Sequence, residues 1–207
     1  MKITKIEQQK KDEKRYSIFL DGKFAFGLSG TDVLYFKLKE GEELEPKKYE
    51  YILEHKVYEE AKTKAFNYIS VGYKTEKEVK DKLFSKEYSE EVVDKVIELL
   101  KKYDYVNDVT YAKKFIEYRT NVKKQGEFKI KHDLKLKGVS NDIISEVFEE
   151  FESDTNDTIV ALIEKKAKGE KEFDFKEKQR ITGFLLRKGF SYDEIKDGFR
   201  SYLEDGR

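Results

Sequence analysis

The sequence predicts a mainly α-helical protein: three tandem three-helix repeats in an elongated, curved array, preceded by a small N-terminal region that contains a β-hairpin. Three related stretches recur at a constant offset of 51 residues: KLFSKEYSEEVV from Lys82, DLKLKGVSNDII from Asp133 and FLLRKGFSYDEI from Phe184. Their apolar residues return every three or four positions, as on one face of a helix. Repeated units that leave an apolar face uncovered bury it by stacking on their neighbours, which favours an extended array.

Residues 1–45 follow a different pattern, in which β-branched and aromatic residues alternate with polar ones. Asp21-Gly22 separates the runs RYSIFL and KFAFGL, and an Asp-Gly pair provides the positive φ angles of a tight hairpin turn. Because a lone hairpin is only marginally stable in water, we expect ITKIE at residues 3–7 to add a third strand and the segment from Thr31 to add a helix. Pro46 suits the first turn of a helix and marks the start of the helical part.

Each repeat is expected to contain three helices. They span residues 57–70, 75–86 and 89–102 in the first repeat, 108–124, 127–137 and 140–151 in the second, and 155–168, 174–188 and 191–203 in the third. The chain therefore divides into a β-rich extension and three repeats, with expected bounds 1–45, 46–104, 105–153 and 154–207.

The repeated positions have distinct structural roles. Helix N-caps, whose side-chain oxygen accepts a hydrogen bond from a backbone N–H, are expected at Ser89, Ser140 and Ser191. Gly138 and Gly189 are expected to end helices in the left-handed conformation, and Glu87 takes that position in the first repeat. Thr75 and Glu78 predict a capping box. The expected core columns are Val79, Ile130 and Ile181; Leu83, Leu134 and Leu185; Val93, Ile144 and Ile195; and Ile97, Phe148 and Phe199.

Composition excludes several classes of function. The 43 Lys and Arg residues balance 43 Asp and Glu residues, which argues against a protein that coats nucleic acid through its overall charge. Zero cysteines exclude disulfides and thiolate chemistry, and His55 and His132 are too far apart to suggest a metal site. No catalytic motif, signal peptide or 18-residue apolar window is visible. We therefore expect a cytoplasmic protein that is not an enzyme, has no cofactor and does not contact the membrane.

A basic segment in the second repeat is the best candidate for a functional surface. Residues 108–138 contain nine Lys or Arg and four Asp or Glu, whereas residues 139–158 contain seven acidic and no basic residues. The candidate partner-binding set is Lys74, Lys77, Arg119, Lys123, Lys124, Lys129, Lys131, Lys135, Lys137, Arg187 and Lys188. The alternative is a solvated helix surface, because Lys137 and Lys188 stand near expected helix ends, where a cation suits the helix dipole.

Several stretches together resemble the RecX family, regulators of the recombinase RecA. They are YISVGYKTEKEVKDKL at 68–83, YVNDVTYAKKFIEYR at 105–119 and QGEFKIKHDLKLKGVS at 125–140, followed by FLLRKGFSYDEI in the third repeat. The N-terminal ITKIEQQKKDEKRYSIFLDGKFAFGL is similar to the extension of RecX proteins from Gram-positive bacteria. The chain departs from the family pattern at Gly72, at Asn107-Asp108 and at Gln125-Gly126-Glu127, where many members carry Arg, two aspartates and Lys-Gly-Pro.

The resemblance implies a regulator of homologous recombination and the SOS response that binds RecA filaments along their groove. Such a protein lowers filament extension, ATP hydrolysis, strand exchange and co-protease activity. The expected partner is the RecA filament, with weaker contact to single- or double-stranded DNA, and we expect a monomer. The two alternatives are a direct DNA-binding helical module and a helical scaffold for another protein.

Overall fold

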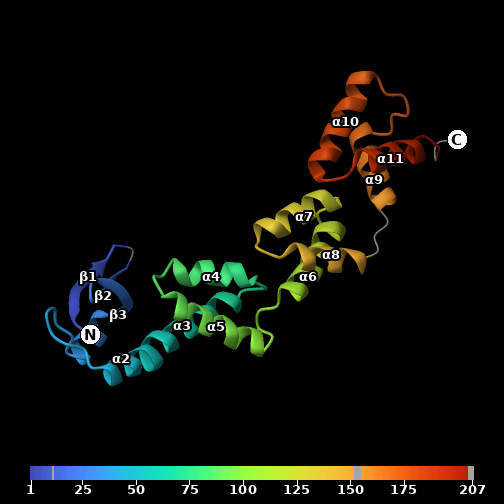
Figure 1. Ribbon diagram of the computed structural model, residues 1–207. Helices are drawn as coiled ribbons and strands as arrows, with labels where there is room; N and C mark the ends of the chain where they lie inside the picture. Colours follow the sequence, from blue (N-terminus) through green and yellow to red (C-terminus); the bar gives the residue numbers. More distant parts are fainter. Residues whose placement is uncertain (11, 152–154, 205–207) are drawn as a thin grey trace. The chain divides into compact units, whose positions relative to one another are not determined.

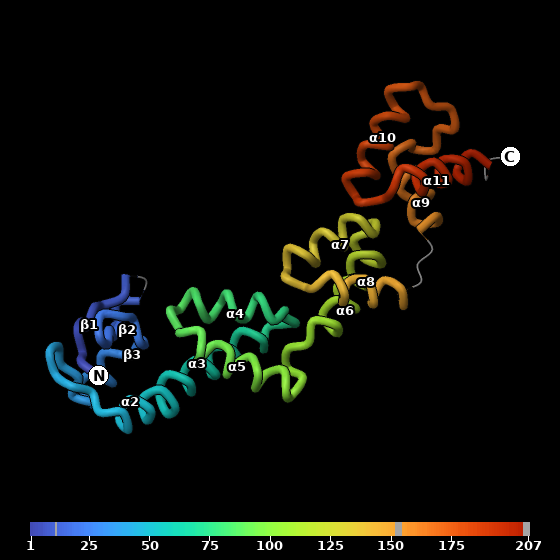
Figure 2. The backbone as a smooth tube through the Cα atoms, viewed as in Figure 1, coloured from blue at the N-terminus to red at the C-terminus, as the bar shows by residue number. Residues whose placement is uncertain are grey.

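The computed structural model describes residues 1–10, 12–151 and 155–204, which fall into two compact units, residues 1–107 and the residues from Asp108 onward. The first unit contains the N-terminal sheet and the first set of three helices, and the second unit contains the other two sets (Figure 1). Figure 2 traces the backbone through the same elements. The expected boundary between residues 153 and 154 lies outside the described residues.

A three-stranded antiparallel sheet in the order β1-β2-β3 opens the first unit. Its strands are β1 (Ile3–Gln9), β2 (Asp12–Leu20) and β3 (Lys23–Ser29), and helix α1 (Gly30–Tyr35) follows. Asp21 and Gly22 have φ angles of 49° and 82°, which confirms the predicted tight turn. Ile18 lies opposite Phe26 in the strand register and both are buried, so this face of the sheet belongs to the core. The expected third strand and short helix are confirmed as well.

A long helical run begins at Pro46, with proline at the first helical position as predicted. Helix α2 (Pro46–Ile52) continues through the π-helical segment Leu53–Tyr58 into α3 (Glu59–Ile69). The helix expected from residue 57 therefore starts earlier. Five positions separate the buried residues Ile52 and Val57, and the usual spacing of four returns at Ala61. This break in the period explains why the pattern did not predict one continuous run.

The remaining expected helices are present within three residues of their predicted ends. They are α4 (Glu76–Phe84) and α5 (Glu90–Lys102), then α6 (Asp108–Asn121), α7 (Glu127–Leu136) and α8 (Asn141–Glu149), then α9 (Thr155–Ala167), α10 (Phe175–Lys188) and α11 (Tyr192–Glu204). The prediction of three three-helix repeats behind a small sheet is thus confirmed.

Each of the later repeats closes around its own hydrophobic core. The second repeat buries Ile130 and Leu134, and the third buries Ile181 and Leu185. The sheet and the first repeat instead share one core. Every residue of the predicted core columns is buried except Phe148, which is half-buried. Burial of the same columns in each repeat is the physical reason for the recurrence in the sequence.

Most of the predicted helix ends are confirmed. Glu87, Gly138 and Gly189 have φ angles of 60°, 87° and 94°, so all three adopt the left-handed conformation. Glu87 adopts it although it has a Cβ atom, which makes positive φ less favourable than it is for glycine. Thr75 and Glu78 form the expected capping box at the start of α4.

The serine caps are confirmed in two repeats and wrong in one. The Ile143 N–H donates to Ser140 Oγ at 3.3 Å. Ser191 forms a capping box: the Glu194 N–H donates to its Oγ at 3.2 Å, and its own N–H donates to the Glu194 carboxylate at 2.6 Å. Ser89 occupies the N-cap position of α5 but makes no side-chain capping bond. Helix α5 starts there because the backbone ladder begins at the Ser89 carbonyl, which needs no hydroxyl.

Alanine at these two kinds of serine position should have different effects on stability. We expect Ser191→Ala to lower the free energy of unfolding by about 1 kcal/mol, because a backbone N–H loses its acceptor. Ser89→Ala is the matched control, with an expected change below about 0.3 kcal/mol because no capping bond is lost. Urea denaturation followed by circular dichroism measures both, and equal losses would contradict the assignment of the caps.

Candidate functional site

The predicted cations of the first repeat interact with residues close to them in the sequence. The Lys74 ammonium lies 5.1 Å from the centre of the Tyr68 ring, and the Lys77 ammonium lies 2.5 Å from the Asp81 carboxylate. Both contacts are local, since the partners are six and four residues away. These two lysines are therefore partly compensated before any partner arrives.

Arg119 is the most strongly held of the predicted residues. Its guanidinium donates to Gln125 Oε1 at 3.1 Å and lies 3.6 Å from the Asp133 carboxylate and 4.6 Å from the centre of the Phe115 ring. The Gln125 N–H in turn donates to the Arg119 carbonyl at 3.0 Å. Arg119 thus fastens the end of α6 to the α6–α7 turn and to α7, which gives it a structural role within the second repeat.

The lysines on α7 and next to its ends have different surroundings. Lys131 pairs with Glu127 at 2.5 Å and lies 4.8 Å from the centre of the Phe148 ring. Lys137, at the C-cap of α7, is half-buried. Lys124 and Lys135 are exposed, and neither forms an ion pair with a carboxylate in the described part of the chain. Lys124 and Lys135 are therefore the predicted cations of this repeat most available to a partner.

Predicted residues of the second and third repeats come together where the α6–α7 turn meets the end of α10. The Lys188 ammonium donates to the Lys123 carbonyl at 2.7 Å. Lys129, in the first turn of α7, lies directly beside the Gly189 backbone. Arg187 is exposed at the neighbouring position of α10. Residues 65 positions apart therefore contribute to one cationic region.

The pKa of Lys188 reflects its burial and also the positive charge of this region. Burial, and then the nearby charges of Lys165 and Lys123, lower the pKa of the Lys188 ammonium. Lys165 is not among the residues predicted from the sequence. Only the Lys165-Lys166 pair in the last turn of α9 gave a signal, and such a pair is common on solvated helices.

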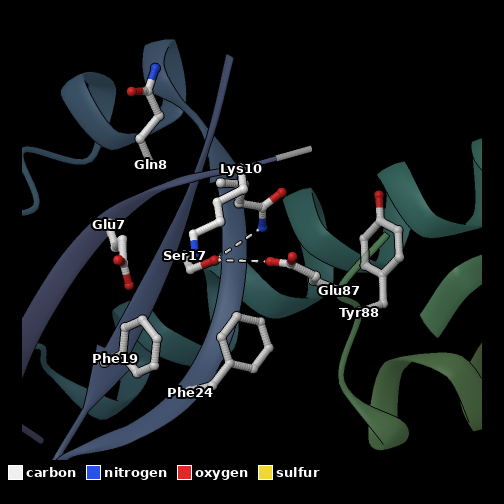
Figure 3. Close-up of a pocket in the computed structure, with 9 residues that line it drawn as sticks. Glu7, Gln8, Lys10, Ser17, Phe19, Phe24, Glu87 and Tyr88 are labelled. Atoms are coloured by element: carbon white, nitrogen blue, oxygen red, sulfur yellow. Dashed lines mark hydrogen bonds between the residues drawn. The ribbon is translucent and has the colours of Figure 1, made fainter. Parts of the chain in front are cut away.

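A second feature, in the first unit, is a cleft of about 620 Å³ between the sheet and the α4–α5 turn (Figure 3). Phe19 and Phe24 line one wall, and their rings meet edge to face with centres 5.9 Å apart. Ser17 Oγ donates to the Glu87 carboxylate at 3.1 Å, which links the sheet to the turn. None of the predicted cations lines this cleft.

Among residues 1–10, 12–151 and 155–204, no group of three or more His, Cys, Asp or Glu side chains is placed to hold a metal ion. Within the same described ranges, no helix is both long and apolar enough to cross a membrane. Tandem three-helix repeats define a class, the helical-repeat protein.

Comparison with known proteins identifies the family. The RecX N-terminal domain matches residues 1–45, and the first, second and third RecX three-helix domains match residues 61–100, 107–147 and 152–197. The chain is 36% identical to the regulatory protein RecX of Clostridium acetobutylicum, over 98% of this chain and 97% of the relative. It is 38% identical to that of Clostridioides difficile, over 94% and 92%. The chain belongs to the RecX family of regulatory proteins.

Solved structures show the same likeness. A crystal structure of a regulatory protein RecX aligns with a TM-score of 0.63 at 28% identity, over 95% of this chain and 98% of that one. The crystal structure of RecX from Lactobacillus salivarius aligns with a TM-score of 0.64 at 29% identity, over 70% of this chain and 96% of that one.

Proposed function

We propose that this protein binds RecA filaments and mainly inhibits them, lowering their extension, ATP hydrolysis, strand exchange and co-protease activity. The observation that carries the proposal is the match of four RecX domains in order along the chain. The protein acts as a non-enzymatic, cytoplasmic monomer in this proposal. Its parts are the extension at 1–45 and the repeats at 46–104, 105–153 and 154–207.

Contacts in this proposal are spread over the repeats. Lys74 and Lys77 contribute from the first repeat, and Arg187 and Lys188 contribute from the third. In the second repeat, the exposed Lys124 and Lys135 offer the least compensated charges. The others of the predicted set also contribute there: Arg119, Lys123, Lys129, Lys131 and Lys137. Several weak contacts along one chain combine through effective concentration, so the loss of one is partly covered by the rest.

The test is the DNA-dependent ATPase rate of RecA as the protein is added, with a parallel DNA-binding assay that lacks RecA. Inhibition is expected at far fewer molecules of this protein than RecA subunits. We expect the double variant Lys124→Glu with Lys135→Glu to need about tenfold more protein for the same inhibition, because two uncompensated charges change sign.

The matched control reverses Lys23 and Lys47, which are also exposed and lie outside the predicted set. It should inhibit as the unchanged protein does, with the same helical content by circular dichroism. Equal loss in both double variants would show a general charge effect, and no inhibition by the unchanged protein would overturn the proposal.

A direct DNA-binding module is the second candidate. Lys124 and Lys135, which form no ion pair with a described carboxylate, favour it. If it holds, the affinity for bare DNA falls steeply between low and moderate salt and RecA has no influence on binding. A helical scaffold for another protein would show neither behaviour.

A further inference from the structure

The second and third repeats are joined through backbone atoms. The Gly126 N–H donates to the Lys188 carbonyl at 2.9 Å, and the Phe128 N–H donates to the Gly189 carbonyl at 3.1 Å. These donors belong to the start of α7 and these acceptors to the end of α10, so each helix end satisfies groups that the other leaves unpaired. The positive end of one helix dipole also meets the negative end of the other.

A glycine is needed at position 126 because of the contact with the third repeat, and its own backbone conformation does not require one. Its φ and ψ angles are −82° and 165°, which any residue adopts easily. A Cβ atom at this position would lie 2.4 Å from the Gly189 oxygen and 2.6 Å from the Phe190 nitrogen. Both are backbone atoms of the third repeat, so they move only if that repeat moves. Gly126→Ala therefore opens the joint and leaves the second repeat's own conformation allowed.

The joint gathers lysines from both repeats. The Lys188 ammonium reaches the Lys123 carbonyl at 2.7 Å. The ammonium groups of Lys166 and Lys188 lie 4.5 and 5.9 Å from the centre of the same Phe184 ring, which places the last turn of α9 beside the end of α10. The lysines at positions 123, 165, 166 and 188 form no ion pair with a carboxylate of the described residues.

We propose that Lys123, Lys165 and Lys188 form one composite site for a phosphate group of a nucleic-acid backbone, and that the site exists only while the Gly126–Gly189 joint is closed. Lysine ammonium groups are compact point charges with three donors each, and lysine is a common ligand of phosphate oxygens. A bound phosphate relieves the repulsion that Lys165 and Lys123 exert on Lys188. The proposal does not rest on any action on RecA.

The test measures binding of a fluorescently labelled oligothymidine to the full chain by anisotropy, at low salt and without RecA. Lys188→Gln and Lys165→Gln are each expected to weaken binding about three- to tenfold and to reduce the slope of log K against log salt by roughly 0.7, the value for one phosphate contact on a single strand. Gly126→Ala should weaken binding by at least as much, although it removes no charge.

Lys176→Gln is the matched control, because it removes the same charge from the other end of α10. It should change affinity less than twofold. If Lys176→Gln weakens binding as much as Lys188→Gln does, the site is only general surface charge and the proposal is wrong. Unchanged affinity in Gly126→Ala also overturns it, because the charges would then suffice without the joint.

Two further measurements control for misfolding and for general polyanion binding. Circular dichroism shows whether Gly126→Ala remains folded, and the lysine variants, which leave the glycines intact, test the site if it does not. Polyglutamate serves as a phosphate-free polyanion: if it displaces the oligonucleotide with the same dependence on Lys165 and Lys188, the preference for phosphate is refuted. Failure here leaves the ATPase test of the proposed function unaffected.

Discussion

Glu60→Ala is expected to lower the free energy of unfolding by about 2–3 kcal/mol, because it leaves the charge of Arg15 buried without its ion-pair partner. The Arg15 side chain is only 4% exposed, and it pairs with Glu60 across the boundary between the sheet and α3. Arg15 also donates to the Gly27 carbonyl at 3.1 Å, and its guanidinium lies 5.4 Å from the centre of the Tyr88 ring. The expected loss is below that of a fully buried pair, since the Glu60 side chain is 37% exposed.

Glu59→Ala is the matched control, one residue away on the same helix. The Glu59 side chain is 50% exposed and pairs with Lys62 at 2.6 Å, so its removal should cost less than about 0.5 kcal/mol. Urea denaturation followed by tyrosine fluorescence and circular dichroism measures both variants. Similar losses in the two would show that the buried pair does not hold the sheet to the first repeat.

The dependence of stability on pH should distinguish Glu60→Ala from the unchanged protein. Burial raises the pKa of Glu60, but hydrogen bonds from Lys64 and Arg15 and the charges of both outweigh it, so the pKa in the folded state lies below the ordinary value. A lowered pKa contributes stability that is fully present above the ordinary value and is lost as the pH falls through the folded-state value. The unchanged protein should therefore lose stability in acid more steeply than Glu60→Ala does.

Gly198→Ala is expected to destabilise the third repeat by about 1–3 kcal/mol, although alanine is normally the better helix former. A Cβ atom on Gly198 would lie 2.3 Å from Cγ2 and 3.1 Å from Cβ of Ile159, at the place where α11 packs against α9. Both are atoms of a fully buried, β-branched side chain with little freedom to turn aside. The two helices must separate to admit the methyl group.

Gly183→Ala gives the opposite expectation in the same repeat. Its Cβ would meet only the tip of the Arg187 side chain, at 3.4 Å, so the helix-propensity gain of up to about 1 kcal/mol should appear in full. Chemical denaturation measures whether each substitution raises or lowers the free energy of unfolding. Hydrogen exchange of the α9 and α11 amides shows where Gly198→Ala lowers stability. Stabilisation by both substitutions would contradict the close packing of α9 on α11.

The secondary structure and the cores were predictable because the determining interactions are local or periodic. A hairpin turn depends on the conformations open to Asp21-Gly22, and a helix end depends on a cap and the following turn. Core columns such as Val79 and Leu83 follow from the period of the helix. The π-helical segment at Leu53–Tyr58 was missed because it breaks that period.

The candidate site was only partly predictable, for a physical reason. Composition selected the basic second repeat, yet the structure gives Arg119 an internal role beside Gln125 and Asp133 and adds Lys165 to the cationic region. Charge along a sequence does not tell which side chains find a partner within the fold.

The sequence by itself determined three repeats, their helices, most of their caps and the residues of each core, since all of these are set within a few turns of chain. Only the tertiary structure decided that the turn at Gly126 meets the end of α10 at Gly189, and that Lys188 reaches the carbonyl of Lys123. Such contacts join residues more than sixty positions apart. They arise from the packing of whole repeats, and no local periodicity records them.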